Sequence, residues 1–216
     1  MPEGPGLIVR KNTSFELTDL DELKRLIQRN PWITLVSHTS TGLVASHYAV
    51  LLDTSSDELA IVGHVGRPDE RLHELGQHEV MVIVQGPHGY ISSSWYDANP
   101  AVPTWNFTVA HLVGVPQILN ADENLAVLDG LVEHFERHVE EPRLMRGSLT
   151  DSEYADRISA GTVGFRLVPS RIEAKTKLSQ NKPVETVERI LTELEGDGPY
   201  ASSALAAEMR RVRNDS

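Results

Sequence analysis

The sequence contains no cysteine, so disulfide bonds and thiolate metal sites are excluded. It also contains no apolar run long enough to cross a bilayer, and its first thirty residues lack the apolar segment of a signal peptide. These absences favour a reducing, aqueous compartment. We therefore expect a cytoplasmic protein that makes no membrane contact.

Basic residues are scarce relative to acidic ones. Twenty Lys and Arg stand against 31 Asp and Glu, which gives a formal net charge of −11. Non-specific DNA affinity comes from basic side chains that displace phosphate counterions, so a whole-surface DNA binder is disfavoured. Two local basic stretches remain as candidates, at residues 171–182 and in the RRVR run at residues 210–213.

Aromatic residues make up only 6% of the chain, yet two of the three tryptophans lie in GPHGYISSSWYDANPAVPTWNF at residues 86–107. Large aromatics are most often core or interface anchors, while indole and phenol donors also suit a half-buried slot. The stretch is therefore either a corner of a core or the wall of a binding site.

Apolar periodicity predicts the elements of an α+β chain. The short turns between the predicted strands indicate antiparallel neighbours, and six or seven strands with flanking helices fit a barrel. Helices are predicted at residues 17–30, 68–75, 121–140 and 151–159 and in a polar tail at 183–213. Strands are predicted at 32–38, 43–52, 58–65, 80–84, 90–96 and 104–119, with a final hairpin at 161–178.

Most catalytic signatures are absent, including a P-loop, a GxSxG elbow and HExxH. His134 and His138 lie four residues apart on a predicted helix, but two ligands make an incomplete metal site. We predict no metal site and identify no catalytic residue.

Residues 171–182, RIEAKTKLSQNK, combine a predicted strand with a polar turn. Alternation places Lys175 and Lys177 on one face, where the donors of Ser179 and Gln180 could help to bind a phosphate or carboxylate. A solvated strand face followed by a polar turn explains the same pattern.

Two further stretches have a similar double interpretation. Residues 44–47, VASH, combine apolar side chains with a hydroxyl and an imidazole. This combination is explained equally well by a polar edge strand and by a planar ligand that lies against the strand. Arg67 follows a glycine-bracketed strand end, where it is either an anion ligand or a solvated loop residue.

Six segments resemble, in order, the PaiB family of FMN-binding negative transcriptional regulators. The resemblance covers roughly residues 10–185 and implies a split β-barrel, FMN as cofactor, and a homodimer with flavin in clefts between subunits. It also implies a barrel domain at 1–182, which includes the N-terminal helix and a helical insertion at 121–159, followed by a helical tail at 183–216. The segments are LVASHYAVLL, GHVGRP, VIVQGPHGYISSSWY, VPTWNF, GTVGFRL and KTKLSQNK.

The resemblance further implies a set of cofactor-binding residues. The isoalloxazine would lie along the second and third strands, and the ribityl phosphate near the loop that follows them. The implied positions are Val44, Ala45, Ser46 and His47 beside the ring, His64 and Arg67 near the phosphate, Lys175, Lys177, Ser179 and Gln180 in the terminal motif, and Tyr90, Trp95 and Trp105 in the aromatic motif.

Three functions follow from the resemblance and from where the chain departs from it. The first is a flavin-dependent regulator or sensor that makes no direct DNA contact, since no helix-turn-helix pattern accompanies the acidic balance. The second is an enzyme, either a flavin oxidoreductase or a recruited flavin-independent activity. The third is a flavin-free dimer that binds another anionic or aromatic ligand. It is motivated by the departures at residues 68–70, Ser93 and Thr176.

Overall fold

The computed structural model describes residues 13–55, 57–97, 100–146 and 149–214. They form two compact units. Of the described residues, unit 1 contains 13–18, 85–97, 100–110 and 173–214, and unit 2 contains 19–55, 57–84, 111–146 and 149–172. Helices and antiparallel strands occur in the same chain, so the predicted α+β class is confirmed.

The described part of the chain contains eight strands, one more than the upper predicted number. The single strand predicted at residues 104–119 is interrupted after Gly114 and forms two strands, β5 and β6. The strands are hydrogen-bonded in the order β6-β7-β3-β2-β1-β4-β5-β8. Unit 2 contains α1 (Leu20–Arg29), β1 (Trp32–Thr39), β2 (Gly42–Leu52), β3 (Ile61–Gly66), α2 (Arg67–Leu72), β6 (Gln117–Ile118), α3 (Ala121–Glu136), α4 (Leu149–Ser159) and β7 (Thr162–Leu167). Three strands contribute to both units: β4 (Val80–Ile91), β5 (Thr104–Gly114) and β8 (Arg171–Lys177). Unit 1 adds the 3₁₀ turns η1 (Thr13–Phe15) and η2 (Ser93–Trp95) and the helices α5 (Val184–Glu195) and α6 (Ser203–Asn214).

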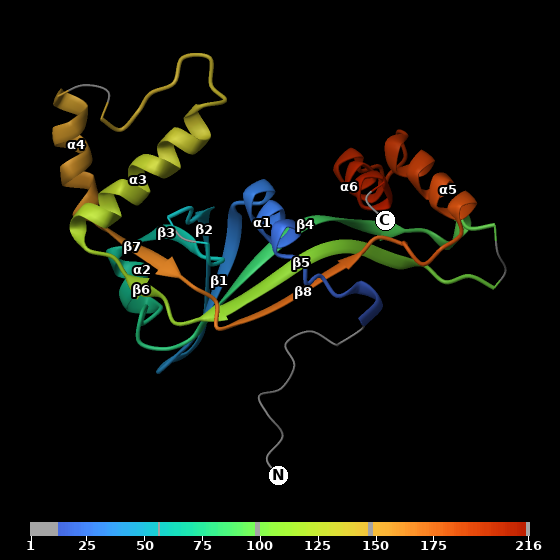
Figure 1. Cartoon of the computed structure of the whole chain (residues 1–216), viewed down its shortest axis with the longest axis horizontal. Coiled ribbons are helices and arrows are strands. Elements are labelled where there is room, and N and C mark those ends of the chain that lie inside the picture. Colours follow the sequence, from blue (N-terminus) through green and yellow to red (C-terminus); the bar gives the residue numbers. More distant parts are fainter. Residues whose placement is uncertain (1–12, 56, 98–99, 147–148, 215–216) are drawn as a thin grey trace, which may run out of the picture. The chain divides into compact units, whose positions relative to one another are not determined.

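The helices of unit 2 begin where the sequence supplies caps. Asp19 accepts a hydrogen bond of 2.9 Å from the Glu22 amide and starts α1, whose apolar face is buried. Asn120 and Glu123 form a reciprocal capping box at the start of α3. Figure 1 shows α3 beside α4, and both helices contact β7.

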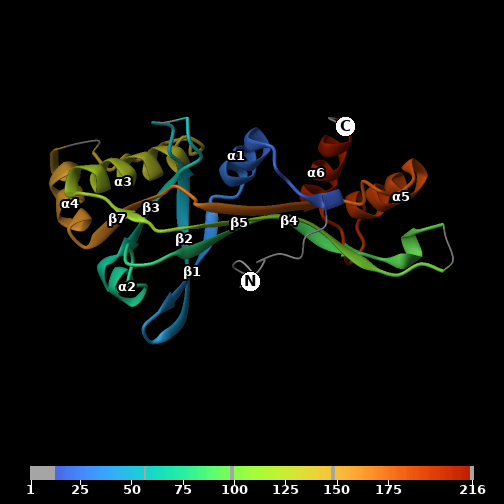
Figure 2. The same ribbon diagram turned by 60° about the horizontal axis from the view of Figure 1, so that its bottom comes forward.

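The β1–β2 hairpin pairs Trp32 with Ala49 at one end and Thr39 with Gly42 at the turn, where Gly42 has a φ of 121°. Figure 2 shows its turn near α2, and the Ser40 amide donates to the Glu74 carboxylate there. Strand alternation buries one face and leaves an exposed one, the outer β1–β2 face, which contains Trp32, Val36, Leu43, Ala45 and His47.

Unit 1 has a core of its own, built largely by the predicted tail. The apolar faces of α5 and α6 pack against each other and against Trp95 and Tyr96. Arg210 pairs with Glu195 at 2.7 Å and ties the two helices together. The buried members of this core are Ile91, Leu178, Val187, Ile190, Leu191, Leu194, Leu205, Ala206 and Met209.

The aromatic motif differs from its prediction. β4 runs through Gly86 and Pro87 as one strand, and the strand predicted at residues 90–96 ends at Ile91. η2 then begins with Ser92, whose hydroxyl accepts from the Ser94 amide. A prolyl residue is tolerated where no ladder hydrogen bond is needed from its nitrogen, so the glycine and proline did not divide the strand.

Gly164 in β7 faces α3 closely enough that a side chain would clash. A Cβ there would lie 3.0 Å from Asn124 Cα and 2.9 Å from its Oδ1. We expect Gly164→Ala to lower the free energy of unfolding by about 1–3 kcal/mol, measured by urea denaturation. Gly130→Ala is the matched control, because its Cβ meets only Leu51 Cδ1 at 4.0 Å and a helical Gly→Ala change adds about 0.5–1 kcal/mol. Equal effects of the two changes would contradict this packing.

Candidate functional site

The four predicted positions on β2 divide between two faces of the strand. Ala45 and His47 are exposed, whereas Val44 and Ser46 are half-buried on the opposite face. The His47 ring is stacked against Trp32, with centroids 6.4 Å apart and planes 15° apart. A planar ligand on the outer β1–β2 face would therefore contact Ala45 and His47 rather than all four residues.

Ser46 belongs instead to a buried polar chain that the sequence did not indicate. His73, fully buried just after α2, bonds through Nδ1 to the Ser37 hydroxyl at 2.8 Å and through Nε2 to the Ser46 hydroxyl at 2.9 Å. The Tyr48 hydroxyl donates to Asp69 at 3.0 Å and is also hydrogen-bonded to Ser46. We name these five residues, Ser37, His73, Ser46, Tyr48 and Asp69, the buried polar chain.

The buried polar chain has one consistent direction of donation. If Tyr48 donates to the Asp69 carboxylate, its oxygen accepts from Ser46, and Ser46 in turn accepts the Nε2 proton of His73. Burial lowers the pKa of His73, an effect that Asp69 partly opposes, so the ring is neutral near pH 7. Burial is also the main cause that raises the pKa of Tyr48 to about 12. The Ser46 hydroxyl is thus committed to protein partners.

His64 and Arg67, the predicted phosphate neighbours, lie at the end of β3 and the start of α2. Nδ1 of His64 is buried and has no hydrogen-bond partner among the described residues, and burial lowers the pKa of this ring. Arg67 is exposed, and its Nε donates to the Ala160 carbonyl at 2.6 Å. The terminal guanidinium nitrogens of Arg67 have no hydrogen-bond partner among the described residues and could meet an anion, while His64 offers a neutral imidazole.

Lysines gather in unit 1 at and beyond the end of β8. Nζ of Lys177 donates to the Thr104 hydroxyl. Burial and then the charges of Lys175 and Lys182 lower the pKa of Lys177. Lys182 also lies over the Tyr96 ring, 5.1 Å from its centroid. The charges of Lys175 and Lys182 thus act unfavourably on the charge of Lys177, so an anion bound beside Lys177 would be favoured. We name the three residues the lysine cluster.

Ser179 and Gln180 are engaged in the structure of the turn that follows β8. Ser179 is buried in the left-handed region at a φ of 61°, and its hydroxyl exchanges hydrogen bonds of 3.0 and 3.1 Å with the buried Asn106 amide. Gln180 folds back to accept from the Leu178 amide and to donate to the Thr176 carbonyl, both at 2.7 Å. Both side chains therefore hold the turn that follows the two lysines.

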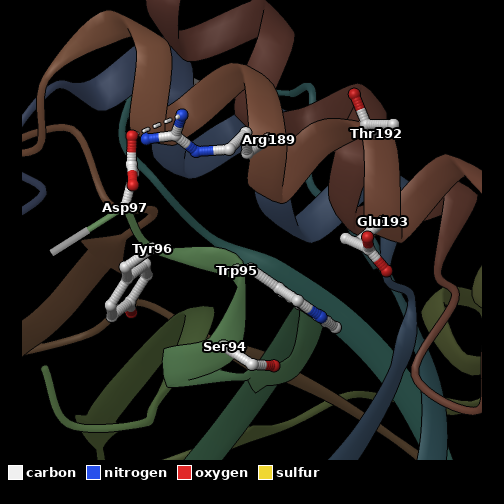
Figure 3. A pocket seen from close by; sticks show the side chains of 7 residues that line it. All are labelled: Ser94, Trp95, Tyr96, Asp97, Arg189, Thr192 and Glu193. Atoms are coloured by element: carbon white, nitrogen blue, oxygen red, sulfur yellow. Dashed lines mark ion pairs between the residues drawn. The ribbon is translucent and has the colours of Figure 1, made fainter.

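The aromatic motif supplies both a core corner and exposed rings. Trp95 packs against the unit 1 core and also lines a cavity of about 410 Å³ (Figure 3). Arg189 and Asp97 form an ion pair of 3.5 Å at this cavity. Tyr90 contacts Trp105 edge to face at a centroid distance of 6.1 Å, and Trp105 is 55% exposed. The remaining lining residues are Ser94, Tyr96, Thr192 and Glu193.

The second basic candidate, the RRVR run, is neutralised by glutamates. Arg210 pairs with Glu195 and Glu188, and Arg213 donates to Glu188 at 2.5 Å. Arg211 pairs with Glu208 at 3.0 Å. These arginines connect or brace α5 and α6, so the run does not form a patch of uncompensated positive charge.

Two features are absent from the described residues. No group of three or more His, Cys, Asp or Glu side chains lies together there as a metal cluster. None of the helices in these residues combines the length and the apolarity needed to cross a membrane.

Two known proteins are similar to this chain in sequence. The chain is 32% identical over 188 residues to "Protease synthase and sporulation protein PAI 2" of Bacillus subtilis, covering 85% of this chain and 87% of that protein. It is 24% identical to an uncharacterized protein of Emericella nidulans, covering 85% and 89% of the two chains.

Solved structures show the same fold at low identity. The flavocytochrome Anf3 from Azotobacter vinelandii has a TM-score of 0.57 and 10% identity, covering 78% of this chain and 72% of that one. The FAD and heme binding protein from Mycobacterium smegmatis has a TM-score of 0.56 and 18% identity, covering 86% and 81%. The fold is the predicted antiparallel split β-barrel type.

A family model described as "Putative FMN-binding domain" matches residues 11–171, three quarters of the sequence. With the identity to the Bacillus subtilis protein across most of both chains, this match shows that the chain belongs to the FMN-binding domain family that includes PaiB.

Proposed function

We propose that the chain is a PaiB-type regulator or sensor that binds FMN and positions the flavin phosphate at the lysine cluster. The observation that carries this assignment is the group Lys175, Lys177 and Lys182. A flavin phosphate carries about two negative charges near neutral pH, which would offset their mutual repulsion. FMN supplies the redox and light-absorbing chemistry, and the chain supplies binding, orientation and electrostatics.

The residues of unit 1 fit a phosphate in a specific way. Lys177 is already held by Thr104, so little side-chain entropy is lost when it meets an anion. Ser179 and Gln180 fix the turn after β8 and thereby hold the backbone that follows Lys177 in place. The role we assign to these two residues is support of the turn rather than contact with the phosphate.

In unit 2 we assign the outer β1–β2 face to a second copy of the chain, whose bound flavin Ala45 and His47 would contact. Ala45 and His47 are exposed beside Trp32, which offers an apolar and aromatic surface. His64 and Arg67 offer an imidazole and a guanidinium at the neighbouring strand end. Variants in each unit test the two assignments separately.

We place the protein in the cytoplasm. Regulation by this protein would pass through a partner or a metabolite rather than through direct DNA contact. The net charge of −11 and the neutralised RRVR run support this proposal. A mobility-shift assay at low salt tests it, because electrostatic DNA binding is strongest there. A shift at low salt with unrelated DNA would overturn it.

Titration of the apoprotein with FMN, followed by flavin fluorescence, tests the cofactor assignment directly. We expect saturable binding of one FMN per chain and weaker binding of riboflavin, which has the same ring but no phosphate. Absence of binding at high micromolar FMN would overturn the proposal. Equal affinity for the two flavins would remove the phosphate role of the lysine cluster.

Homodimerisation through the outer β1–β2 face predicts that a buried charge will disrupt it. Leu43 and Val102 are both 76% exposed in the single chain, but only Leu43 belongs to this face. We expect Leu43→Glu to convert a dimer into a monomer in sedimentation velocity, because the carboxylate would be desolvated. Val102→Glu should leave the dimer intact. A wild-type monomer, or equal behaviour of the two variants, would contradict the assignment.

A further inference from the structure

The connection between α5 and α6 places Tyr200 against the aromatic motif. Its ring centroid lies 4.8 Å from that of Tyr90, with the planes 50° apart. Tyr90 in turn contacts Trp105 at 6.1 Å and 71°. Tyr200 lies outside residues 11–171, the part that matches the family model. The three rings form a contiguous surface, which we name the aromatic platform.

The backbone holds Tyr200 firmly in this position. The Ala201 amide donates to the Gly198 carbonyl at 3.0 Å and closes a turn whose second residue is Pro199. The next amide, that of Ser202, donates to the Leu194 carbonyl at 2.7 Å and ties the turn to the end of α5. Tyr200 is thus presented by a closed turn rather than by a free loop.

The start of α6 is also fixed relative to β4. Leu205 is fully buried, and a Cβ on Gly89 would come within 2.9 Å of its Cδ2. Gly89 and Tyr90 are neighbours, so the contact that positions α6 is adjacent to the one that Tyr200 makes. The contact between Tyr200 and Tyr90 is therefore positioned by the packing of α6 against β4.

The aromatic platform is nevertheless open to solvent. Tyr200 is 51% and Trp105 is 55% exposed, although aromatic side chains usually bury most of their surface. No hydrogen bond among the described residues uses the Tyr90 and Tyr200 hydroxyls or the Trp105 indole N–H. The platform therefore combines exposed ring faces and edges with three polar donors.

We propose that Tyr200 is a ligand-binding residue and that the aromatic platform binds a flat, fused heteroaromatic ring. Rings inclined at 50° and 71° offer both face and edge contacts to one planar ligand, and the donors suit ring nitrogens and carbonyl oxygens. The identification of this ring as that of a flavin rests on the proposed function. The connection between α5 and α6 would then contribute a ligand contact, while the two helices complete the core.

Binding of FMN and of riboflavin to Tyr200 variants tests this inference. We expect Tyr200→Ala to weaken both ligands by about tenfold, because stacking of one planar ring on an aromatic side chain contributes about that much. Tyr200→Phe should keep binding within about threefold, as it retains the ring and loses one donor. Tyr154→Ala is the matched control, since Tyr154 is 58% exposed on α4 in unit 2.

The outcomes separate the two proposals. Wild-type FMN binding that is unchanged in Tyr200→Ala would overturn the role of Tyr200 and leave the proposed function intact. No FMN binding by the wild type would overturn the proposed function, and with it the flavin as occupant. Tyr200→Leu, which keeps apolar packing on Tyr90, replaces the alanine variant if thermal unfolding shows that the latter does not fold, and it should show the same loss.

Discussion

Replacement of both Lys175 and Lys177 by alanine is expected to weaken FMN binding at least about a hundredfold. Each hydrogen bond between charged groups contributes about 1.5–3 kcal/mol, so two lost contacts amount to about 3–6 kcal/mol. This loss of affinity should occur only for a ligand that carries the phosphate group. Riboflavin binding by the same variant should therefore stay close to the wild-type value.

The lysine variant should remain folded, because repulsion within the lysine cluster is reduced when two of its charges are removed. Lys24→Ala is the matched control, since it removes one lysine from unit 2, where Lys24 lines a different cavity. Isothermal titration calorimetry at two salt concentrations measures the affinities, and the wild type should show the steeper salt dependence. Equal loss of FMN and riboflavin affinity would point to unfolding and contradict the phosphate assignment.

The second large effect is expected for His73→Leu. This substitution should lower the free energy of unfolding by about 2–4 kcal/mol. The ring is fully buried and bonded at both nitrogens to Ser37 and Ser46. Leucine has a comparable size but cannot bond either hydroxyl. The loss of stability therefore comes from two hydroxyls that lose their hydrogen-bond partner rather than from a cavity.

A double variant separates this cause from a general packing defect. Ser37→Ala removes a hydroxyl that His73→Leu would leave buried without its partner, so the combination should be more stable than His73→Leu alone by about 1 kcal/mol. Urea denaturation of the two single variants and the double variant gives the coupling. Strict additivity of the single effects would contradict the hydrogen-bonded arrangement.

The His73 variant also predicts a change in pH dependence. Burial lowers the pKa of His73 in the folded state, so below pH 6.5 the unfolded state binds more protons than the folded one. This contribution to stability is complete above about pH 6.5 and is lost as pH falls towards the lowered pKa. The thermal midpoint of the wild type should drop between pH 7 and 5.5, and that of His73→Leu should drop less.

Local patterns in the sequence predicted the regular elements well. The cap at Asp19 and the period of the following leucines determine α1, and Asn120 with Glu123 determines the start of α3. These signals act over three or four residues, so they can be read without the tertiary structure. Gly86 and Pro87 misled the prediction of β4 because the same residues mark either a turn or an irregular strand position.

The candidate site was less predictable, because each of its side chains has several possible partners. Ser179 and Gln180 have the polar groups expected of ligands, and only the structure shows that Asn106 and the backbone engage them. Tyr200 gave no signal, since its contact with Tyr90 joins residues 110 positions apart. No local pattern encodes such a contact.

By itself the sequence determined the absence of thiol chemistry, the acidic surface, the α+β class and the ordered motifs that resemble the FMN-binding family. Composition and short-range periodicity are sufficient for these conclusions. Only the tertiary structure decided which β2 residues face outward, how His73 links two strands, and that the RRVR arginines are neutralised. The physical reason is that the orientation of the β2 side chains depends on sheet register. The His73 hydrogen bonds and the arginine ion pairs depend on contacts between residues distant in the chain, which form only when the core packs.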